Sequence, residues 1–494
     1  MDFVTMLLVL PFVFLTGFYV LRSKNSKLPP GPYPFPIIGN LLQLGRNPHI
    51  SLAKLSKTYG PLMYLKLGSL KTIVVSSPDM AKEVLQKHDQ AFTGRFIPVA
   101  AEALDHHKLC IAYLPVGNEW RKYRKICREQ MFSTSRLDAS QGLRQEKLEK
   151  LCEYVRKCAV SGRVVNIGEA AYTTTLNLMS ATLFSTEFAQ FDSDAVQEMK
   201  LVIGGYLRVI AIPNLADFFP ALKMIDPQGI KKESEIYTAK MLSMLDDIIN
   251  QRVKSRDDDH SSRNDDLLEV LLNPTQGNDD YDLTREDIKH FLTDLLIGGT
   301  DTSADLVEWG MTELLRNPNK MSKAKDELRV VIGENNRIKE SDISRLPYLQ
   351  AVMKENLRLH PVVPLLVPKK TEVDVEINGY MIPKNAQLVI NAWAIGKDPS
   401  IWSNSDSFEP ERFLNNKIDY KGQDFELIPF GSGRRICPGL PLASRMSHLM
   451  LASLIHNFNW KLEPGVKPEE LDTNEKFGLT LHKVVPLKAV PIIL

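Results

Sequence analysis

A glycine-rich loop that ends in one cysteine, residues 430–439, constrains this chain more than any other stretch. It reads FGSGRRICPG and leads directly into an apolar segment with helical spacing. A thiol just before a helix lies near the positive end of the helix dipole, and Arg434 and Arg435 are close in sequence, so we expect the thiolate of Cys437 to be favoured. Thiolates bind metals, and glycines let backbone approach a large flat group. The alternative is an ordinary buried thiol.

The spacing of the loop is more specific than its composition. The pattern Phe-x-x-Gly-x-Arg-x-Cys-x-Gly is matched at Phe430, Gly433, Arg435, Cys437 and Gly439 and resembles the haem-binding sequence of the cytochrome P450 family. The resemblance implies that Cys437 is the metal ligand of haem b and that Phe430, Arg435 and Gly439 also contact this cofactor. A thiolate ligand favours cleavage of the O–O bond.

Length and composition favour one large globular domain. The chain has 494 residues, and no stretch in its middle has the composition of a linker between domains. Its net charge of +1 gives no general case for binding nucleic acid, so charged partners would need a local patch. The five cysteines are odd in number and lack paired spacing, which argues against a disulfide scaffold or a zinc site.

The N-terminus predicts a membrane anchor. Residues 3–21 carry no charge and are just long enough to cross a hydrocarbon core of about 30 Å. Arg22, Lys24 and Lys27 follow, which places the downstream part on the cytoplasmic side. A cleaved signal peptide is the alternative, but a basic leading region is missing. We expect an anchor at 1–21, a stiff basic and proline-rich hinge at 22–36, and a catalytic domain at 37–494.

The chain after the hinge predicts a mainly α-helical fold with small β-sheets. Residues 61–67 and 72–75 are β-prone runs that predict a hairpin, and Asn378-Gly379 predicts a second one. Residues 92–114 are aperiodic and predict a long loop. In the resembled family this segment covers the substrate pocket, so the resemblance makes candidates of Phe96, Ile97, Val99, Leu104 and Leu109, although each alone is more often simple packing.

A basic helix is predicted at residues 119–128. Trp120 and Arg124 are four residues apart and therefore face the same way. They match the family pattern Trp-x-x-x-Arg, which implies contact with a haem propionate. Arg121, Lys125 and Arg128 form a neighbouring stripe, and the resemblance implies that an NADPH-cytochrome P450 reductase docks on this side. The alternative is an ordinary solvated face.

A long helix is predicted from about residue 282, and its centre holds two glycines. Gly298 and Gly299 cost about 1 kcal/mol each relative to alanine, so they need a reason. The resemblance implies that the helix loosens here above the haem, and that Asp301 and Thr302 are catalytic groups that relay protons to dioxygen. The alternative is a glycine pair needed only for close helix packing. The apolar stretch 201–219 could be pocket roof, membrane contact or core.

Three charged residues are expected to have a structural role. Glu355 and Arg358 lie one helical turn apart, which by itself is often only a surface pair. In the resembled family this pair is buried and joined by an arginine from Pro-Glu-Arg-Phe, which here is Arg412. The resemblance therefore implies that the three side chains fix the segment before the cysteine loop.

A proline-interrupted apolar stretch, residues 361–368, cannot be helical. The resemblance places this stretch beside the haem. Together with the central helix and the segment 477–481, the stretch supplies further candidates for the substrate pocket, which are Ile297, Gly298, Val362, Val363, Leu365, Leu366 and Leu479. Lys369 stands where many relatives have an arginine that holds a propionate. A lysine lacks the planar fork of arginine, so this contact stays open.

The resemblance covers nearly the whole chain and extends to the plant branch of the family that oxidises terpenoids. That narrower likeness depends on residues 55–63, 176–184 and 421–424. It implies a monooxygenase of the endoplasmic reticulum membrane that hydroxylates an apolar diterpene of labdane or abietane type, with electrons from NADPH through the reductase. The alternatives are a monoterpenol oxidase, a reductase-independent isomerase or dehydratase, and a haem protein that binds ligands without turnover.

Overall fold

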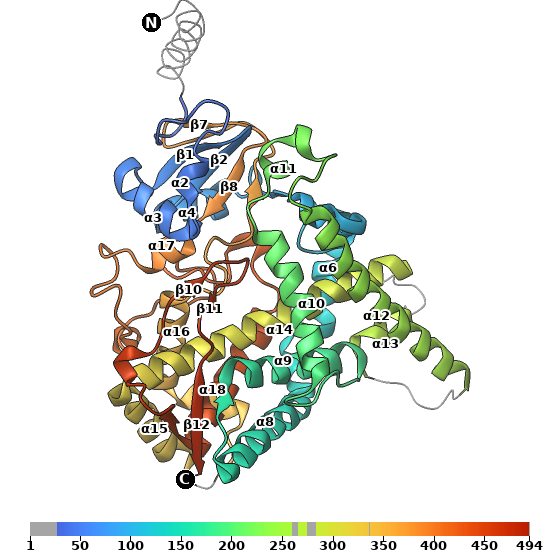
Figure 1. The fold of residues 1–494 in the computed structure, drawn as a ribbon, viewed down its shortest axis with the longest axis vertical. Coiled ribbons are helices and arrows are strands. Elements are labelled where there is room, and N and C mark those ends of the chain that lie inside the picture. Colours follow the sequence, from blue (N-terminus) through green and yellow to red (C-terminus); the bar gives the residue numbers. More distant parts are fainter. Residues whose placement is uncertain (1–26, 259–264, 274–282, 335, 494) are drawn as a thin grey trace, which may run out of the picture.

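The computed structural model describes residues 27–258, 265–273, 283–334 and 336–493. The expected membrane span lies outside these residues. Helix α14, Arg285–Arg316, crosses the middle of the molecule (Figure 1). Thr284 caps it, because its hydroxyl accepts a hydrogen bond from the Asp287 N–H and the Asp287 carboxylate accepts one from the Thr284 N–H. The predicted long helix is confirmed from this cap onward.

Helices make up most of the described chain and pack around α14. Its neighbours include α9 (Ile167–Phe184), α16 (Pro347–Leu359) and α18 (Leu440–Asn457), and α9 packs against it most extensively. The other described α-helices of six or more residues are α3 (Pro48–Tyr59), α6 (Asn118–Ile126), α7 (Thr134–Ala139), α8 (Gln141–Ser161), α10 (Asp194–Ala211), α12 (Ile230–Asp258), α13 (Leu267–Leu272) and α15 (Pro318–Ile332). Shorter helices are α2 (Leu41–Leu44), α4 (Pro78–Lys82), α5 (His106–Leu109), α11 (Leu215–Phe218) and α17 (Ala392–Gly396).

The largest sheet of the described residues has five strands in the order β1-β2-β8-β5-β3. These are β1 (Leu62–Leu67), β2 (Leu70–Val75), β8 (Gln387–Ile390), β5 (Lys369–Lys370) and β3 (Gly94–Arg95). Both predicted hairpins are confirmed, as β1 pairs with β2 and β6 (Val375–Ile377) pairs with β7 (Tyr380–Ile382). The remaining strands are β4 (Val165–Asn166), β9 (Phe458–Leu462), β10 (Glu475–Lys476), β11 (His482–Lys483) and β12 (Lys488–Ile493).

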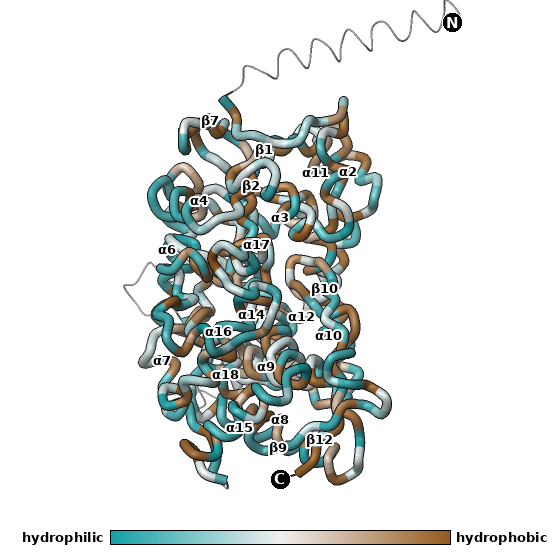
Figure 2. The backbone as a smooth tube through the Cα atoms, turned by 90° about the vertical axis from the view of Figure 1, so that its left-hand side faces the viewer, coloured by the Kyte–Doolittle hydropathy of each residue, from teal (hydrophilic) through white to brown (hydrophobic). Residues whose placement is uncertain are grey.

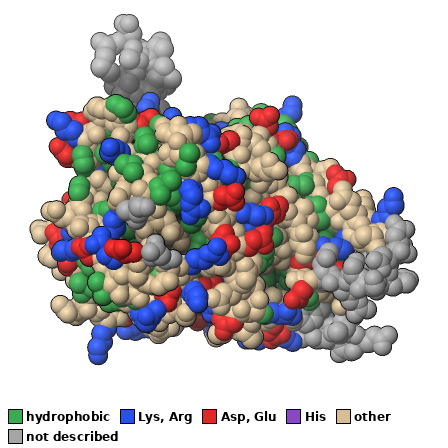
Figure 3. All heavy atoms as spheres, turned by 90° about the horizontal axis from the view of Figure 1, so that it is seen from below, with side chains coloured by type: hydrophobic (Ala, Val, Ile, Leu, Met, Phe, Trp, Pro, Cys, Tyr) green, Lys and Arg blue, Asp and Glu red, His purple; other side chains and the backbone are tan. Residues whose placement is uncertain are grey.

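The five-stranded sheet and the three-stranded sheet β4-β12-β9 lie at opposite ends of the molecule (Figure 1). In Figures 1 and 2, β1 and β2 lie at one end of the molecule, and β12 lies at the opposite end near the C-terminus. The largest apolar core fills the helical part between them and includes Phe291, Leu296 and Leu449. On the face shown in Figure 3, acidic and basic side chains are interspersed, as the small net charge leads one to expect.

Two expectations about irregular segments need correction or completion. Residues 92–114 are not one long loop, because they contain β3, a 3₁₀ turn at Val99–Asp105 and α5. These elements are too short to show a hydrophobic period, which is why sequence pattern did not reveal them. The apolar stretch 201–219 forms the end of α10 and α11. Its region, Asp194–Phe218, has the length and apolarity of a membrane span but is half buried in the protein.

Candidate active site

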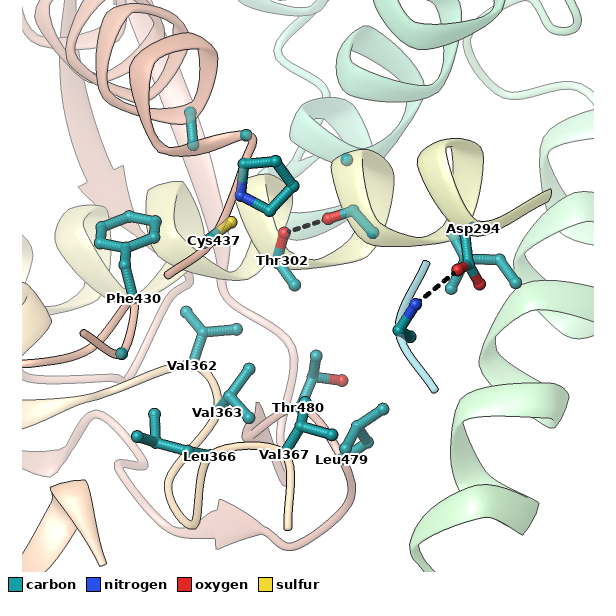
Figure 4. A pocket seen from close by; sticks show the side chains of 18 of the residues that line it. Asp294, Thr302, Val362, Val363, Leu366, Val367, Phe430, Cys437, Leu479 and Thr480 are labelled. Carbon is teal, nitrogen blue, oxygen red and sulfur yellow. Dashed lines mark hydrogen bonds between the residues drawn. The ribbon is translucent and has the colours of Figure 1, made fainter. Parts of the chain in front are cut away.

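A cavity of about 380 Å³ lies between α14, the start of α18 and the segment after α16. Its lining is mostly apolar and includes Leu178, Met179, Ile297, Val362, Val363 and Leu366. Figure 4 shows Thr302 and Cys437 on one side of this cavity and Val362, Val363 and Leu366 on the other. One thiol, one hydroxyl and a hydrophobic wall therefore face the same space.

The cysteine loop holds Cys437 at the edge of this cavity by its backbone. The Cys437 N–H donates to the Phe430 carbonyl at 3.0 Å, which closes the loop. Gly433 has a φ of +71°, and a Cβ there would lie 2.5 Å from the Leu85 carbonyl oxygen, so only glycine fits. Phe430 and Gly439 also line the cavity.

The electrostatics of Cys437 differ from the sequence expectation. Burial raises the pKa of its thiol, and the N–H groups of Gly439 and Leu440 and the charge of Arg124 only partly oppose this. The expected help from Arg434 is wrong, because Arg434 points to the surface and pairs with Asp89. The thiolate therefore requires a stronger positive charge than the protein supplies, and a bound metal ion would supply it.

Four cationic side chains meet at one edge of the cavity: Arg95, Arg124, Lys369 and Arg435. Burial and Arg435 lower the pKa of Arg95 to about 9, and burial and Arg124 lower that of Arg435 to about 10. Burial, with Arg95 and Arg435, lowers the pKa of Lys369 well below its usual value. Neighbouring cations that lower one another's pKa would be stabilised by a bound dianion. The two propionates of haem together carry this charge.

The predicted propionate contacts lie together in this cluster. The guanidinium carbons of Arg124 and Arg435 lie 5.6 and 5.2 Å from the ring centre of Trp120. Arg124 donates to the Ile436 carbonyl at 2.8 Å, which ties α6 to the cysteine loop. Lys369 donates to the Phe92 carbonyl at 3.2 Å.

Sequence reasoning missed Arg95, which the structure places in the same cluster. Its guanidinium donates to the carbonyls of Ala112 (3.2 Å) and Val367 (2.6 Å), so it joins two segments that line the cavity. The only signal in the sequence was one arginine among the mostly apolar residues 92–101 of the aperiodic segment. A basic residue is costly to bury without a partner, and this makes Arg95 a candidate for anion binding.

One face of α14 presents Asp294, Gly298 and Thr302 to the cavity. The spacing of four residues places them in one row, a signal that was available in the sequence but unused for Asp294. The Asp294 carboxylate accepts from the Ala112 N–H at 3.1 Å and lies 3.2 Å from His106 Nε2. The Thr302 hydroxyl donates to the Gly298 carbonyl at 2.7 Å.

The two glycines of α14 have different environments. A Cβ at Gly298 would meet nothing within 4 Å, so this glycine keeps space open in the cavity. A Cβ at Gly299 would lie 2.5 Å from the sulfur of Met179, so this glycine allows close packing against α9. The close-packing interpretation therefore applies to Gly299, and Gly298 leaves space in the cavity.

Asp301 does not line the cavity, unlike its neighbour Thr302. Its carboxylate is buried behind the wall and accepts a hydrogen bond from the Thr480 hydroxyl at 2.7 Å. Thr480 does line the cavity, so it connects Asp301 with that space.

The candidate substrate contacts fall into three places. Ile297, Gly298, Val362, Val363, Leu366 and Leu479 line the main cavity. Phe96 and Leu365 line a smaller neighbouring cavity of about 170 Å³, which shares Leu366 and Leu479 with the first. Ile97 packs against the cluster of Ala101, Cys110 and Tyr113, and Leu104 is exposed. Ile97 and Leu104 thus lie outside the main cavity.

Glu355, Arg358 and Arg412 form a buried ion network. Glu355 accepts hydrogen bonds from Arg358 at 2.7 and 2.8 Å and from Arg412 at 3.1 Å. Arg358 also donates to the carbonyls of Gly396, Ser405 and Ser407. The network thus ties α16 to the segment that precedes the cysteine loop.

Comparison with known proteins agrees with this geometry. The sequence pattern of the family described as Cytochrome P450 matches residues 29–486. The chain belongs to the cytochrome P450 family. It is a P450 monooxygenase with a helix-rich P450 fold, and haem iron is the cofactor of this family.

Several plant P450s are similar over their whole length. The chain is 54% identical to Cytochrome P450 76T24 of Catharanthus roseus over 98% of both chains. It is 52% identical to a ferruginol synthase of Isodon rubescens over 100% of both, and 49% identical to a sugiol synthase of Salvia miltiorrhiza over 99% of both. The likeness to the plant terpenoid-oxidising branch, predicted from sequence, is confirmed.

Proposed function

We propose that this P450 hydroxylates an apolar diterpene of labdane or abietane type, with Cys437 as the iron ligand. The main support is the cavity itself, where a thiol, an apolar wall and a row of cations face one space. The names of the relatives, ferruginol synthase and sugiol synthase, favour a diterpene over a monoterpenol or a fatty acid. When bound, the haem supplies the activation of dioxygen and the transfer of one oxygen atom to a C–H bond.

The residues of this chain have four roles in this proposal. Trp120, Arg124 and Arg435, with Arg95 added from the structure, hold the propionates, while Phe430 and Gly439 contact the macrocycle. Ile297, Val362, Val363, Leu366 and Leu479 position the substrate by apolar contact and exclude water, and Phe96 and Leu365 act from the adjoining cavity. Thr302, whose hydroxyl lies at the cavity wall, passes a proton to the cavity, and Asp301 supplies the next one. Glu355, Arg358 and Arg412 fix the loop.

The ligand assignment can be tested with two half-buried cysteines. Cys437→Ser should abolish the absorption band of a thiolate-ligated haem in the reduced, carbon monoxide-treated protein. Cys152→Ser is a matched control, because Cys152 is also half-buried but lies beside Asn457, outside the cavity. Retention of the thiolate band in Cys437→Ser would disprove the ligand assignment.

Electron delivery by an NADPH-dependent reductase is proposed to occur on α6. This helix presents Trp120 and Arg124 to the cavity, while Arg121 on α6 and Arg128 in the turn that follows it are exposed. A partner that binds this basic surface would therefore lie close to the haem edge. The double variant Arg121→Gln/Arg128→Gln should slow reduction by the reductase at low salt but leave reduction by dithionite unchanged.

Membrane attachment is proposed from the sequence of residues 1–36, with 1–21 as a single span in the endoplasmic reticulum, 22–36 as the hinge and 37–494 as the cytoplasmic catalytic domain. The full chain should stay in the membrane pellet after alkaline carbonate extraction. The variant that lacks residues 1–21 should be released into the supernatant. A glycosylation site placed before residue 3 should be modified, because that end would lie in the lumen. Retention of the truncated protein in the membrane pellet would contradict the single-anchor proposal.

The substrate proposal is tested with membranes that contain this chain and a plant reductase. They receive NADPH, ¹⁸O₂ and a mixture of diterpenes, monoterpenols and fatty acids, and the products are identified by mass spectrometry. We expect one ¹⁸O atom in a diterpene product. Label only in a monoterpenol or a fatty acid would overturn the diterpene assignment, and product formation without NADPH or label would favour the isomerase or dehydratase alternative.

A further inference from the structure

Behind the cavity wall, His482 lies between two aspartates of α14. Its Nδ1 is 2.9 Å from Asp305 Oδ1, and its Nε2 is 3.5 Å from Asp301 Oδ2. Asp301 and Asp305 are one helical turn apart, so α14 presents both carboxylates to the first residue of β11. The imidazole therefore joins α14 to β11.

Thr480 completes a continuous hydrogen-bond chain. Its Oγ1 lies 2.9 Å from His482 Nε2 and donates to Asp301 Oδ2 at 2.7 Å. Because the Thr480 hydroxyl donates its one proton to Asp301, its oxygen must accept the hydrogen bond from the Nε2–H of His482. The order of groups is thus imidazole, hydroxyl, carboxylate.

The two ends of this chain have different access to water. The His482 side chain is 34% exposed, whereas the side chains of Asp301 and Asp305 are each 8% exposed. Thr480 is buried but belongs to the cavity wall. The chain therefore runs from solvent, through His482, to the buried carboxylate next to Thr302.

The charges around His482 favour its protonated form. Asp301, Asp305 and Glu308 face it from α14. Tyr172 of α9 lies near Asp301, and the charges of Lys200 and Lys483 interact with Glu308. Burial alone would lower the pKa of His482, but Asp305 and Asp301 outweigh burial and raise the pKa to about 9. Burial raises the pKa of Asp305 to about 7, and its Oδ2 has no hydrogen-bond partner.

We propose that His482 is a positioning residue that carries protons from solvent to Asp301 through the Thr480 hydroxyl. The inference rests on the proposed function, because monooxygenation consumes protons at the cavity. The Nε2 proton of His482 moves to the Thr480 oxygen while the Thr480 hydroxyl proton moves to the Asp301 carboxylate. Asp301 then releases this proton toward Thr302 and becomes a carboxylate again. The imidazole then takes one proton from water, so the chain returns to its starting state with one proton delivered.

The first measurement needs no turnover. The imidazole C2 hydrogen exchanges with deuterium at a rate that depends on the protonation of the ring. Mass spectrometry of the peptide that contains His482, over a series of pH values, therefore reports the pKa of His482 in the holoenzyme. We expect a midpoint near 9 in the wild type. In Asp305→Asn the midpoint should fall toward the ordinary value of about 6.5, since one compensating carboxylate is gone. A wild-type midpoint near 6.5 would overturn the inference.

The second measurement is the amount of product formed per NADPH consumed, with haem content determined in each preparation. His482→Gln keeps a donor but cannot titrate, and Thr480→Val removes only the hydroxyl in the middle of the chain. Both should lower the product yield several-fold and release more peroxide, and Thr480→Val should leave the His482 midpoint high. His88→Gln is the control, because His88 is similarly exposed at 38% and pairs weakly with Glu83 at 3.8 Å.

The outcomes separate the two proposals. If His482→Gln and Thr480→Val match His88→Gln in product yield and pH dependence, the network is only structural and the inference is wrong. If the wild type makes no oxygenated product from any substrate, the proposed function fails, and the exchange midpoint alone still decides whether His482 holds a proton between the two aspartates.

Discussion

The guanidinium of Arg358 and the carboxylate of Glu355 form a two-pronged ion pair in which neither side chain reaches solvent. Every remaining donor direction of Arg358 is directed to a carbonyl of the segment at residues 396–407. This pair therefore does more than stabilise one helix. It fixes the path of the chain that leads to Cys437.

Removal of Glu355 should be strongly destabilising. Glu355→Ala leaves two buried arginines without their anion, and loss of one partner of a buried pair costs about 3–5 kcal/mol. The free energy of unfolding, measured with urea and tryptophan fluorescence, and the haem content should both fall. The control Glu153→Ala, in an exposed pair with Lys157, should change neither. Equal stability of the two variants would contradict the structural role of Glu355.

The glycine pair of α14 offers a matched comparison. Gly298→Ala should raise the free energy of unfolding by about 1 kcal/mol, because alanine favours helix and nothing lies within 4 Å. It should also weaken substrate binding, since the methyl group enters the cavity. Gly299→Ala should show no such gain, because overpacking against Met179 costs about 1–3 kcal/mol. The same stability change in both would show that the two environments are equivalent.

Arg95 is expected to be needed for haem retention. Arg95→Gln removes one of the four cations and frees the carbonyls of Ala112 and Val367. Haem should pass faster from the variant to added apomyoglobin. The free energy of haem binding should fall by about 1.5–3 kcal/mol, the size of one charge-assisted hydrogen bond. Arg434→Gln is the control, since Arg434 points away from the cavity toward Asp89. If Arg95→Gln loses haem at the wild-type rate, Arg95 does not contribute to haem binding.

Thr302 is expected to control how efficiently electrons are used. Thr302→Val removes the hydroxyl that faces the cavity but keeps the shape of the side chain. Peroxide released per product should rise, while NADPH consumption continues, because proton supply but not reduction is impaired. The control is Thr312→Val on the same helix, whose hydroxyl bonds to the Glu308 carbonyl away from the cavity. Unchanged peroxide release would count against the proton relay.

Glu475 should make stability depend on pH. Its carboxylate lies near His49 Nε2 (3.1 Å) and accepts from Trp393 Nε1 (3.0 Å). Burial alone would raise its pKa, but His360, His49 and Lys397 outweigh burial and hold the pKa well below 4.5. A depressed carboxylate pKa stabilises the fold above the unfolded-state pKa, and this contribution is lost as the pH falls through the folded-state pKa.

Glu475→Gln should therefore lower the free energy of unfolding at pH 7 by about 1.5–3 kcal/mol, the size of hydrogen bonds to a charged group. The difference from wild type should stay constant down to about pH 4.5 and shrink below it. Urea unfolding at a series of pH values measures this difference. A difference that grew on acidification would have the wrong sign and would refute the assignment.

The sequence by itself determined the family, the cysteine ligand candidate and the order of the main elements. The loop around Cys437, the Trp120–Arg124 pair and the Glu355–Arg358 pair are all local patterns, in which residues three to nine positions apart carry the information. Helix caps and hairpin turns, such as Thr284 and Asn378-Gly379, are local for the same reason: their hydrogen bonds close within a few residues.

Only the tertiary structure decided which side chains share a space. Arg95 joins Arg435, which is distant in the chain, and Thr480 reaches Asp301 from another element. It also decided that Asp301 lies behind the cavity wall, that Phe96 and Leu365 line a second cavity, and that burial raises the pKa of Cys437. These properties depend on packing and desolvation between segments far apart in sequence, which local spacing does not encode.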